Sequence, residues 1–305
     1  MAWKKLRQIF VADKQSDWMY SHASNPVIWR FRGSVGRVFF SCRDKESRSH
    51  IAFVDIDFAN DFSIVKVSDE PVLSPGEPGL FDDSGAVMGS FLKIEKSWYL
   101  YYLGWNLKVT VPWLNTIGVA LYNEQDDTFE KLSKAPMMDR SNVDPFSISY
   151  PFVLNDKGMF RMWYGSNLNW GSEQSYMNHV IKYAESKDGL NWNRLGHIAI
   201  PLKHRNEYAL SKPWVVKENG IYKMWYSYRG NGSIDTYRIG YAESKDGLDW
   251  IRKDAEVGID VSDRGWDSNM INYPCVFNWS NKRFMLYNGN DYGKTGFGVA
   301  IFENY

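Results

Sequence analysis

A short aromatic segment recurs along the chain at an almost constant interval. Two clear copies are Phe160-Arg-Met-Trp-Tyr164 and Tyr222-Lys-Met-Trp-Tyr226. The last aromatic residues of all the copies are Phe40, Tyr102, Tyr164, Tyr226 and Tyr287. Their spacings are 62, 62, 62 and 61 residues. A repeat of this length indicates a fold of similar units, each of which buries its faces against its neighbours.

Each repeat contains apolar segments of strand length and no helical periodicity. A segment upstream of the aromatic one carries Pro26, Gly85, Pro151, Pro213 or Pro274. A third segment begins at Ile51, Ile117, Ile181, Ile239 or Phe297. A fourth follows at 62–67, 128–132, 192–195 and 250–253. Four antiparallel strands per unit predict an all-β five-bladed β-propeller. We expect one domain over 1–305, with blades at about 20–68, 82–133, 146–196, 208–254 and 268–304.

The fifth repeat has only three such segments, because the printed chain stops after the third. The N-terminal stretch Trp3-Lys-Lys-Leu-Arg-Gln-Ile-Phe10 is similar to Trp192-Asn-Arg-Leu-Gly-His-Ile198, which belongs to a fourth segment. We therefore expect residues 3–10 to complete the last blade. Such a strand closes the ring and leaves no exposed sheet edge.

The repeated run Ser-Lys-Asp-Gly-Leu-x-Trp at 186–192 and 244–250 lies in the turn between the third and fourth segments. Asp-Gly is a strong hairpin signal, so these turns are interpreted as structural. The opposite face of the meander holds the start of the first strand, the end of the second and the start of the third. Candidate chemistry is expected on that face.

Acidic residues precede the first strand in four repeats. The candidate catalytic residues are Asp83, Asp144, Glu207 and Asp267, with Asp82 adjacent to the first of them. The first repeat has no acid next to its strand and offers His22 and Asn25. For each acid alone, hydrogen bonding to its own turn is an alternative role. As a set, they favour a pocket at one end of the propeller axis.

Polar and aromatic residues also follow each aromatic segment at a fixed distance. The residues three positions after the repeated aromatic are Arg43, Trp105, Asn167, Arg229 and Asn290. The other candidate substrate-binding residues are His22, Asp44, Asn106, Arg140 and Lys212. This set suits hydroxyl and anionic groups. Three alternatives stay open: Arg140 pairing with Asp139, Lys212 neutralising Glu207 or Asp83, and Trp105 covering the core.

Composition narrows the class of partner. Of the 305 residues, 50 are aromatic, which favours strands. The 36 basic and 36 acidic residues balance, so we expect no nucleic-acid or anionic-membrane partner. No signal peptide or membrane-spanning run is recognisable, which predicts a cytoplasmic protein. Two cysteines make no disulfide framework, and the five histidines show no metal-ligand spacing. We expect no cofactor and no metal, and the oligomeric state is open.

The whole chain resembles the five-bladed propeller glycoside hydrolases around families 43, 32, 68 and 130. The resemblance rests on the five units, the Met-Trp-Tyr strand, the Tyr-Ala-Glu-Ser-Lys-Asp-Gly-Leu-x-Trp hairpin and the closing N-terminal strand. It implies an Asp base or nucleophile from blade one, an orienting Asp from a middle blade and an acid Glu from a later one. Asp144 and Glu207 lie near the second and third of these positions, whereas Ser24-Asn25-Pro26 stands where the first Asp is expected. The chain also resembles cytosolic proteins connected with bacterial surface-glycan biosynthesis.

Two classes of function follow. The first is a glycoside-active enzyme with Glu207 as acid, Asp83 as base or nucleophile, and Asp144 or Asp267 as orienting groups. Such chemistry needs two carboxyls across the scissile bond, roughly 5–9.5 Å apart. Arg43, Arg229, Arg140 and Lys212 indicate an anionic sugar or sugar phosphate, and a phosphate-dependent glycoside phosphorylase is the nearest variant. The second class is a non-catalytic carbohydrate-binding propeller.

Overall fold

The computed structural model describes residues 2–170, 177–230 and 235–303. Within them the fold is nearly all β, with only two short helical segments, η2 (Asp254–Glu256) and α1 (Asn290–Gly293). Aromatic and β-branched residues populate the strands, as expected of side chains that pack well on pleated surfaces.

The strands form antiparallel meanders in chain order. Meander one contains β2 (Ser21–Arg32), β3 (Val35–Arg43), β4 (Ser49–Asp57) and β5 (Ser63–Val67). Meander two contains β6 (Gly85–Ile94), β7 (Ser97–Leu107), β8 (Trp113–Asn123) and β9 (Thr128–Lys131). Meander three contains β10 (Ile148–Asp156), β11 (Met159–Asn167), β12 (His179–Ser186) and β13 (Ile198–Ile200). Meander four contains β14 (Ala209–Glu218), β15 (Ile221–Arg229), β16 (Arg238–Ser244) and β17 (Ile251–Arg252).

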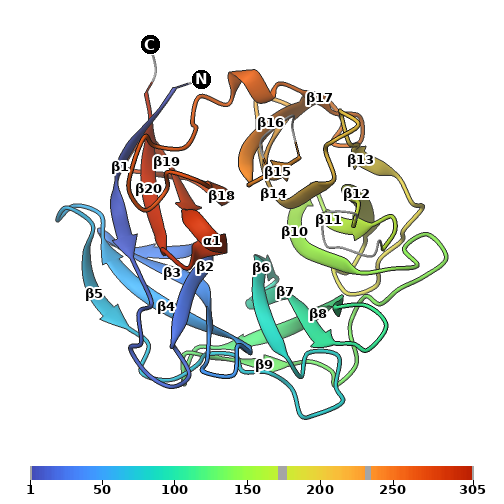
Figure 1. Ribbon diagram of the computed structural model, residues 1–305, viewed down its shortest axis with the longest axis horizontal. Helices are drawn as coiled ribbons and strands as arrows, with labels where there is room; N and C mark the ends of the chain where they lie inside the picture. Colours follow the sequence, from blue (N-terminus) through green and yellow to red (C-terminus); the bar gives the residue numbers. More distant parts are fainter. Residues whose placement is uncertain (1, 171–176, 231–234, 304–305) are drawn as a thin grey trace.

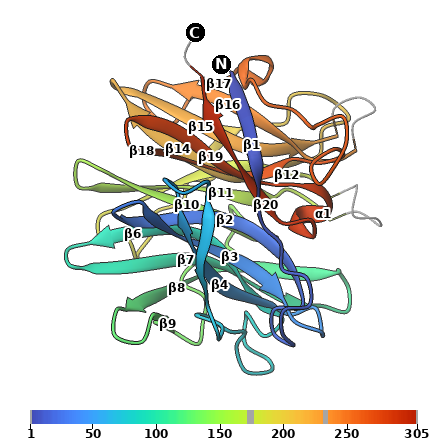
Figure 2. The same ribbon diagram turned by 90° about the vertical axis from the view of Figure 1, so that its left-hand side faces the viewer.

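Meander five is assembled from both ends of the chain. Its strands β18 (Asn272–Trp279), β19 (Lys282–Asn288) and β20 (Phe297–Phe302) are joined by β1 (Trp3–Phe10), which pairs antiparallel with β20. Figures 1 and 2 both show β1, in blue, alongside β20, in red. The expected pairing of residues 3–10 with the last repeat is therefore present.

The first strands of the meanders lie around a common centre (Figure 1). They contact one another in the order β2, β6, β10, β14, β18, and β18 in turn contacts β2. The resulting architecture places the start of each first strand and the end of each second strand near this centre, which is where the sequence predicts a pocket.

A bulge interrupts the first strand of four meanders, at the residue before the repeated proline. Asn25, Tyr150, Lys212 and Tyr273 adopt φ of 53°, 47°, 50° and 55° there. The pairing with the second strand shifts register at the same places. A bulge redirects its side chain relative to the regular pleat. The bulges therefore change the direction of these four side chains relative to a regular strand.

The two Asp-Gly hairpins accept hydrogen bonds from side chains of the preceding meander. Trp163 donates its indole N–H to the Gly247 carbonyl at 3.0 Å, and the Tyr101 hydroxyl donates to the Gly189 carbonyl at 2.8 Å. Gly189 and Gly247 have φ of +77° and +80°, which favours glycine. These contacts agree with the structural interpretation of the two turns.

Candidate ligand-binding site

A cavity of about 370 Å³ lies where the five meanders meet. Its polar and aromatic lining comes from all of them: His22, Asn25 and Arg43 from the first, Trp105, Trp113 and Asn115 from the second, Tyr150, Asn167 and His179 from the third, Arg229 and Tyr237 from the fourth, and Tyr273 and Tyr292 from the fifth. A volume in this range suits a small-molecule ligand.

Five of the residues predicted to bind substrate line this cavity: His22, Arg43, Trp105, Asn167 and Arg229. Four of them stand three positions after the repeated aromatic. That position lies at or near the end of the second strand of a meander, which the topology brings to the centre.

The other five predicted binding residues do not line it. Asp44 accepts hydrogen bonds from Arg48 and His50, and Asn106 donates to the Leu80 carbonyl. Arg140 is exposed, with Asp139 4.0 Å away, and Asn290 accepts from two backbone N–H groups. Lys212 is buried, and its Nζ donates to the Gly89 carbonyl at 2.5 Å rather than to Glu207 or Asp83.

The two cavity arginines have no carboxylate partner among the described residues. Arg229 is 7% exposed and donates from Nη1 to the Tyr292 hydroxyl at 2.6 Å. Its guanidinium lies 4.9 Å and 4.8 Å from the ring centroids of Tyr208 and Tyr237. Arginine over aromatic faces is stabilised by cation–π attraction, but its positive charge is retained. The described lining of the cavity therefore carries two arginine charges and no acidic side chain.

Two cavity histidines add no further charge near neutral pH. Burial, followed by the nearby Arg43 and Lys294 charges, lowers the pKa of His22 to about 4. Burial, followed by the Arg229 charge, lowers the pKa of His179 to about 4. Both rings are neutral at pH 7. Nδ1 of His179 donates to the Leu210 carbonyl at 3.1 Å, so its other ring nitrogen is a hydrogen-bond acceptor.

None of the four candidate catalytic carboxyls lines the cavity. Asp144 is fully buried and accepts from Tyr164 at 2.8 Å and Ser166 at 2.7 Å. It also pairs with Lys182 at 3.0 Å and Arg194 at 3.1 Å. With four donors, both its oxygens are committed.

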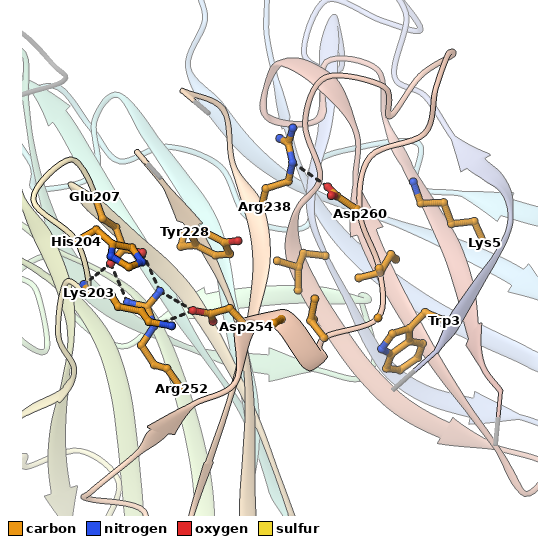
Figure 3. Close-up of a pocket in the computed structure, with 15 residues that line it drawn as sticks. Trp3, Lys5, Lys203, His204, Glu207, Tyr228, Arg238, Arg252, Asp254 and Asp260 are labelled. Carbon is orange, nitrogen blue, oxygen red and sulfur yellow. Dashed lines mark hydrogen bonds and ion pairs between the residues drawn. The ribbon is translucent and has the colours of Figure 1, made fainter. Parts of the chain in front are cut away.

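Asp267 and Glu207 are held in the same manner. The Asp267 carboxylate accepts from the Tyr287 hydroxyl at 3.0 Å and pairs with Lys5 of β1 at 2.7 Å. Both oxygens of Glu207 lie 2.7 Å from the Arg252 guanidinium, in a bidentate pair. Glu207 faces a separate groove, where Arg252 also contacts Asp254, as Figure 3 shows.

Asp83 lies in a turn, and its neighbour Asp82 occupies the buried position. Asp83 accepts from the Gly79 N–H and the Ser84 hydroxyl. Asp82 accepts from the Tyr102 hydroxyl at 2.9 Å and pairs with Lys131 at 2.6 Å. The contacts of Asp83 are those of the alternative turn role recognised in the sequence.

We call each set of a buried acid, the repeated tyrosine and a cation an anchor cluster. The cation lies in the fourth strand of the meander or, for Arg194, in the segment before that strand. The three simple members are Asp82–Tyr102–Lys131, Asp144–Tyr164–Arg194 and Asp267–Tyr287–Lys5. In meander four, Tyr226 donates to Asp254, which shares Arg252 with Glu207. Meander one has Phe40 in place of the tyrosine and no acid before its strand. The repeats that have an acid before the first strand also have the tyrosine, and the repeat without the acid has phenylalanine. This correspondence is a sequence signal that the acids have a structural role.

Two of the bulge residues that line the cavity were missed by the sequence analysis. Tyr150 and Tyr273 line the cavity, and their hydroxyls lie 3.3 Å apart although they come from meanders three and five. The available signal was their position before Pro151 and Pro274, which matches that of Asn25 and Lys212.

Within 2–170, 177–230 and 235–303, no three His, Cys, Asp or Glu side chains come close enough to hold a metal ion. Among the same residues, no helix is long and apolar enough to cross a membrane.

A comparison with curated proteins shows 46% identity over 304 residues to "Uncharacterized protein Rv1502" of Mycobacterium tuberculosis, covering all of both chains. The chain belongs to the family of that mycobacterial protein. A shorter match, 37% identical over 104 residues, covers 33% of this chain and 35% of a "1,2-beta-oligomannan phosphorylase" of Thermoanaerobacter sp.. No family model matches the chain.

Solved structures share the fold at low sequence identity. One, described as "Glycoside hydrolase", has a TM-score of 0.75 at 16% identity and covers 98% of this chain and 91% of its own. A family-43 glycoside hydrolase has a TM-score of 0.68 at 17% identity, covering 95% and 93%. A GH130 structure, whose description names β-1,2 mannosidic linkages, has a TM-score of 0.70 at 12% identity, covering 99% and 94%. These comparisons confirm that the fold resembles that of glycoside hydrolase propellers.

Proposed function

We propose that this protein binds an anionic sugar, such as a sugar phosphate, in the central cavity. The observation that carries the proposal is the presence of Arg43 and Arg229 in a cavity whose described lining contains no Asp or Glu. Arg229 is buried, and a buried charge is normally paired, so this arginine indicates a ligand of opposite sign. Arg43 is exposed and adds a second positive charge to the cavity lining. The surrounding hydroxyl, amide and imidazole groups suit sugar hydroxyls.

Hydrolysis by a pair of carboxyls receives less support from the cavity. Such a mechanism requires one protonated and one ionised carboxyl on either side of the glycosidic bond. The candidate acids Asp144, Glu207 and Asp267 are committed to cations of the anchor clusters. The cavity therefore supports binding of an anionic sugar better than it supports hydrolysis by two carboxyls.

A phosphate-dependent glycoside phosphorylase is the second candidate. Two observations favour it: the partial match to an oligomannan phosphorylase, and the arginines, which would hold inorganic phosphate. In that reaction the phosphate itself attacks the sugar, so one carboxylate fewer is needed than in hydrolysis.

We also propose that the five meanders are the blades of one closed five-bladed propeller, completed by β1. Support comes from the β1–β20 pairing, from the Lys5–Asp267 ion pair and from the β18–β2 contact. The blade boundaries, a cytoplasmic location and a role in surface-glycan biosynthesis stay predictions from the sequence.

Calorimetric titration of the purified protein tests the binding proposal. The ligands are the 1- and 6-phosphates of mannose and glucose, with the neutral hexoses as reference. We expect saturable binding of at least one hexose phosphate and at least tenfold weaker binding of the neutral sugar. Arg43→Ala should lower the affinity for the phosphate at least tenfold, since a charge-assisted hydrogen bond contributes roughly 1.5–3 kcal/mol.

Arg140→Ala is the matched control, because Arg140 is an exposed arginine outside the cavity. It should leave the affinity unchanged. Equal weakening by both variants, or no binding by the wild type, would overturn the proposal. Incubation with β-1,2-linked mannobiose, with and without phosphate, separates the two candidates: mannose 1-phosphate appears only if the protein is a phosphorylase.

A further inference from the structure

The central cavity has two chemically different walls. The indole wall consists of Val87, Leu103, Trp105 and Trp113, all from meander two. The phenol wall consists of Arg229, Tyr237, Tyr273 and Tyr292, from meanders four and five. The first strands contact in the order β2, β6, β10, β14, β18 and back to β2, so meander two borders meanders one and three. The indole and phenol walls therefore lie on opposite sides of the cavity.

The phenol wall is built around a cation with unused donors. Nη1 of Arg229 donates to Tyr292, whereas its Nε is buried without a hydrogen-bond partner. The amide nitrogen of Asn167 is likewise buried and unpartnered. A buried donor without an acceptor costs roughly 1–3 kcal/mol. An anion beside Arg229 would supply the missing acceptors.

The partner of Arg229 is held in a costly backbone conformation. Tyr292 has φ of 58° and the preceding Asp291 has φ of 53°. Non-glycine residues rarely occupy this region, and such strain persists where the surrounding structure enforces it. Here it directs the Tyr292 hydroxyl to the guanidinium, so the phenol wall is arranged before a ligand arrives.

The indole wall presents a fixed apolar face. The Trp105 indole N–H donates to the Ser49 hydroxyl at 3.2 Å, which fixes the orientation of the ring. Trp105 is also only partly buried, so part of its surface is left for a ligand. A flat ring of this kind offers a broad apolar surface, and the C–H face of a pyranose is its complement.

We propose that Arg229 and Tyr292 hold the anionic group of the ligand while Trp105 stacks against its sugar ring across the cavity. The ligand is then a compact sugar of one or two rings with its charge at one end, consistent with a volume near the lower end of the roughly 300–1,000 Å³ range of ligand pockets. This inference rests on the proposed function, because it specifies how the anionic sugar is oriented.

Two variants and two probes test the orientation. The probes are mannose 6-phosphate, or the hexose phosphate of the panel above with the highest affinity, and inorganic phosphate, which has no sugar ring. Arg229→Gln should weaken both probes at least tenfold. Trp105→Ala should weaken the hexose phosphate at least tenfold and change the affinity for inorganic phosphate less than twofold.

Near-ultraviolet circular dichroism checks that each variant is folded. If Arg229→Gln does not fold, Tyr292→Phe replaces it, because this change removes only the hydroxyl that Arg229 contacts. We expect Tyr292→Phe to weaken both probes three- to tenfold. Arg229→Lys, which keeps the charge, should recover part of the affinity.

The outcomes separate this inference from the proposed function. If the wild type binds none of the hexose phosphates, both fail. If it binds one, but Trp105→Ala weakens inorganic phosphate as strongly as the hexose phosphate, the proposed function stands and the orientation is overturned. The orientation is also overturned if a folded Arg229→Gln or Tyr292→Phe variant keeps wild-type affinity for both probes.

Discussion

The anchor clusters and the central cavity handle buried charge in opposite ways. In the three simple clusters, each acid has both a cation and a hydroxyl donor, as for Asp144 with Arg194 and Tyr164. In meander four, Glu207 is paired with Arg252, and the Tyr226 hydroxyl donates to Asp254. In the cavity, the buried Arg229 has no acidic partner among the described residues and is surrounded by aromatic rings instead. The exposed Arg43 likewise has no acidic partner there. The chain has no net charge. Its buried acids are nevertheless paired with cations in the clusters, whereas the cavity arginines have no acidic partner within the described ranges.

This difference identifies the region available for function. Removing a charge from water is costly unless a partner compensates, and the clusters meet that requirement internally. Tyrosine rings around Arg229 reduce the cost without cancelling the charge. Arg229 keeps its charge without an acidic partner in the part of the chain that the structure describes, so its side of the cavity is expected to gain from an anionic ligand.

Removing one cluster acid should have the largest effect on stability. Asp144→Asn leaves Lys182 and Arg194 buried without their counter-charge, so we expect a loss of about 3–5 kcal/mol in the free energy of unfolding. Urea unfolding followed by tryptophan fluorescence measures it. A loss below about 1 kcal/mol would mean that the anchor clusters do not stabilise the scaffold.

Replacing the buried lysine at the axis should change how stability depends on pH. Burial lowers the pKa of Lys212 from 10.5 to about 7. Between about pH 7 and 10.5, the unfolded chain then binds a proton that the folded protein lacks, so this group makes stability rise with pH. Its contribution to the slope is at most about 1.4 kcal/mol per pH unit.

Below about pH 7, Lys212 is protonated in both states, so its contribution no longer changes with pH and stays at its least favourable. Lys212→Met should remove the slope between pH 7 and 9 and stabilise the protein at neutral pH. Urea unfolding of wild type and variant across this range checks it. Parallel pH profiles would show that Lys212 keeps an ordinary pKa.

The smallest effect is expected at Asp83. Asp83→Asn keeps an acceptor for the Gly79 N–H, and no buried cation depends on this side chain. We expect a change within about 0.5 kcal/mol in unfolding free energy and an unchanged affinity for hexose phosphates. A large loss of affinity would instead return Asp83 to the candidate site, and calorimetric titration would detect it.

The repeat of 61 or 62 residues predicted much of the fold, because strand order and turn positions follow from local patterns. The same pattern predicted the residues that reach the centre from the ends of the second strands: Arg43, Trp105, Asn167 and Arg229. It could not show which way the acids before the first strands face. A residue beside a strand start can be directed to the cavity or between meanders, and the spacing is the same in both cases.

By itself, the sequence determined the meander repeat, the joining of residues 3–10 to the last unit, and the ring of residues that end the second strands. Only the tertiary structure decided which charges are used internally. Asp144 and Glu207 pair with arginines 50 and 45 residues further along the chain, and Asp267 pairs with Lys5 of the N-terminal strand. Tyr150 and Tyr273, which stand at bulges, line the cavity. The physical reason is that the pairing of buried charges depends on distances between segments far apart in the chain, which local spacing does not contain.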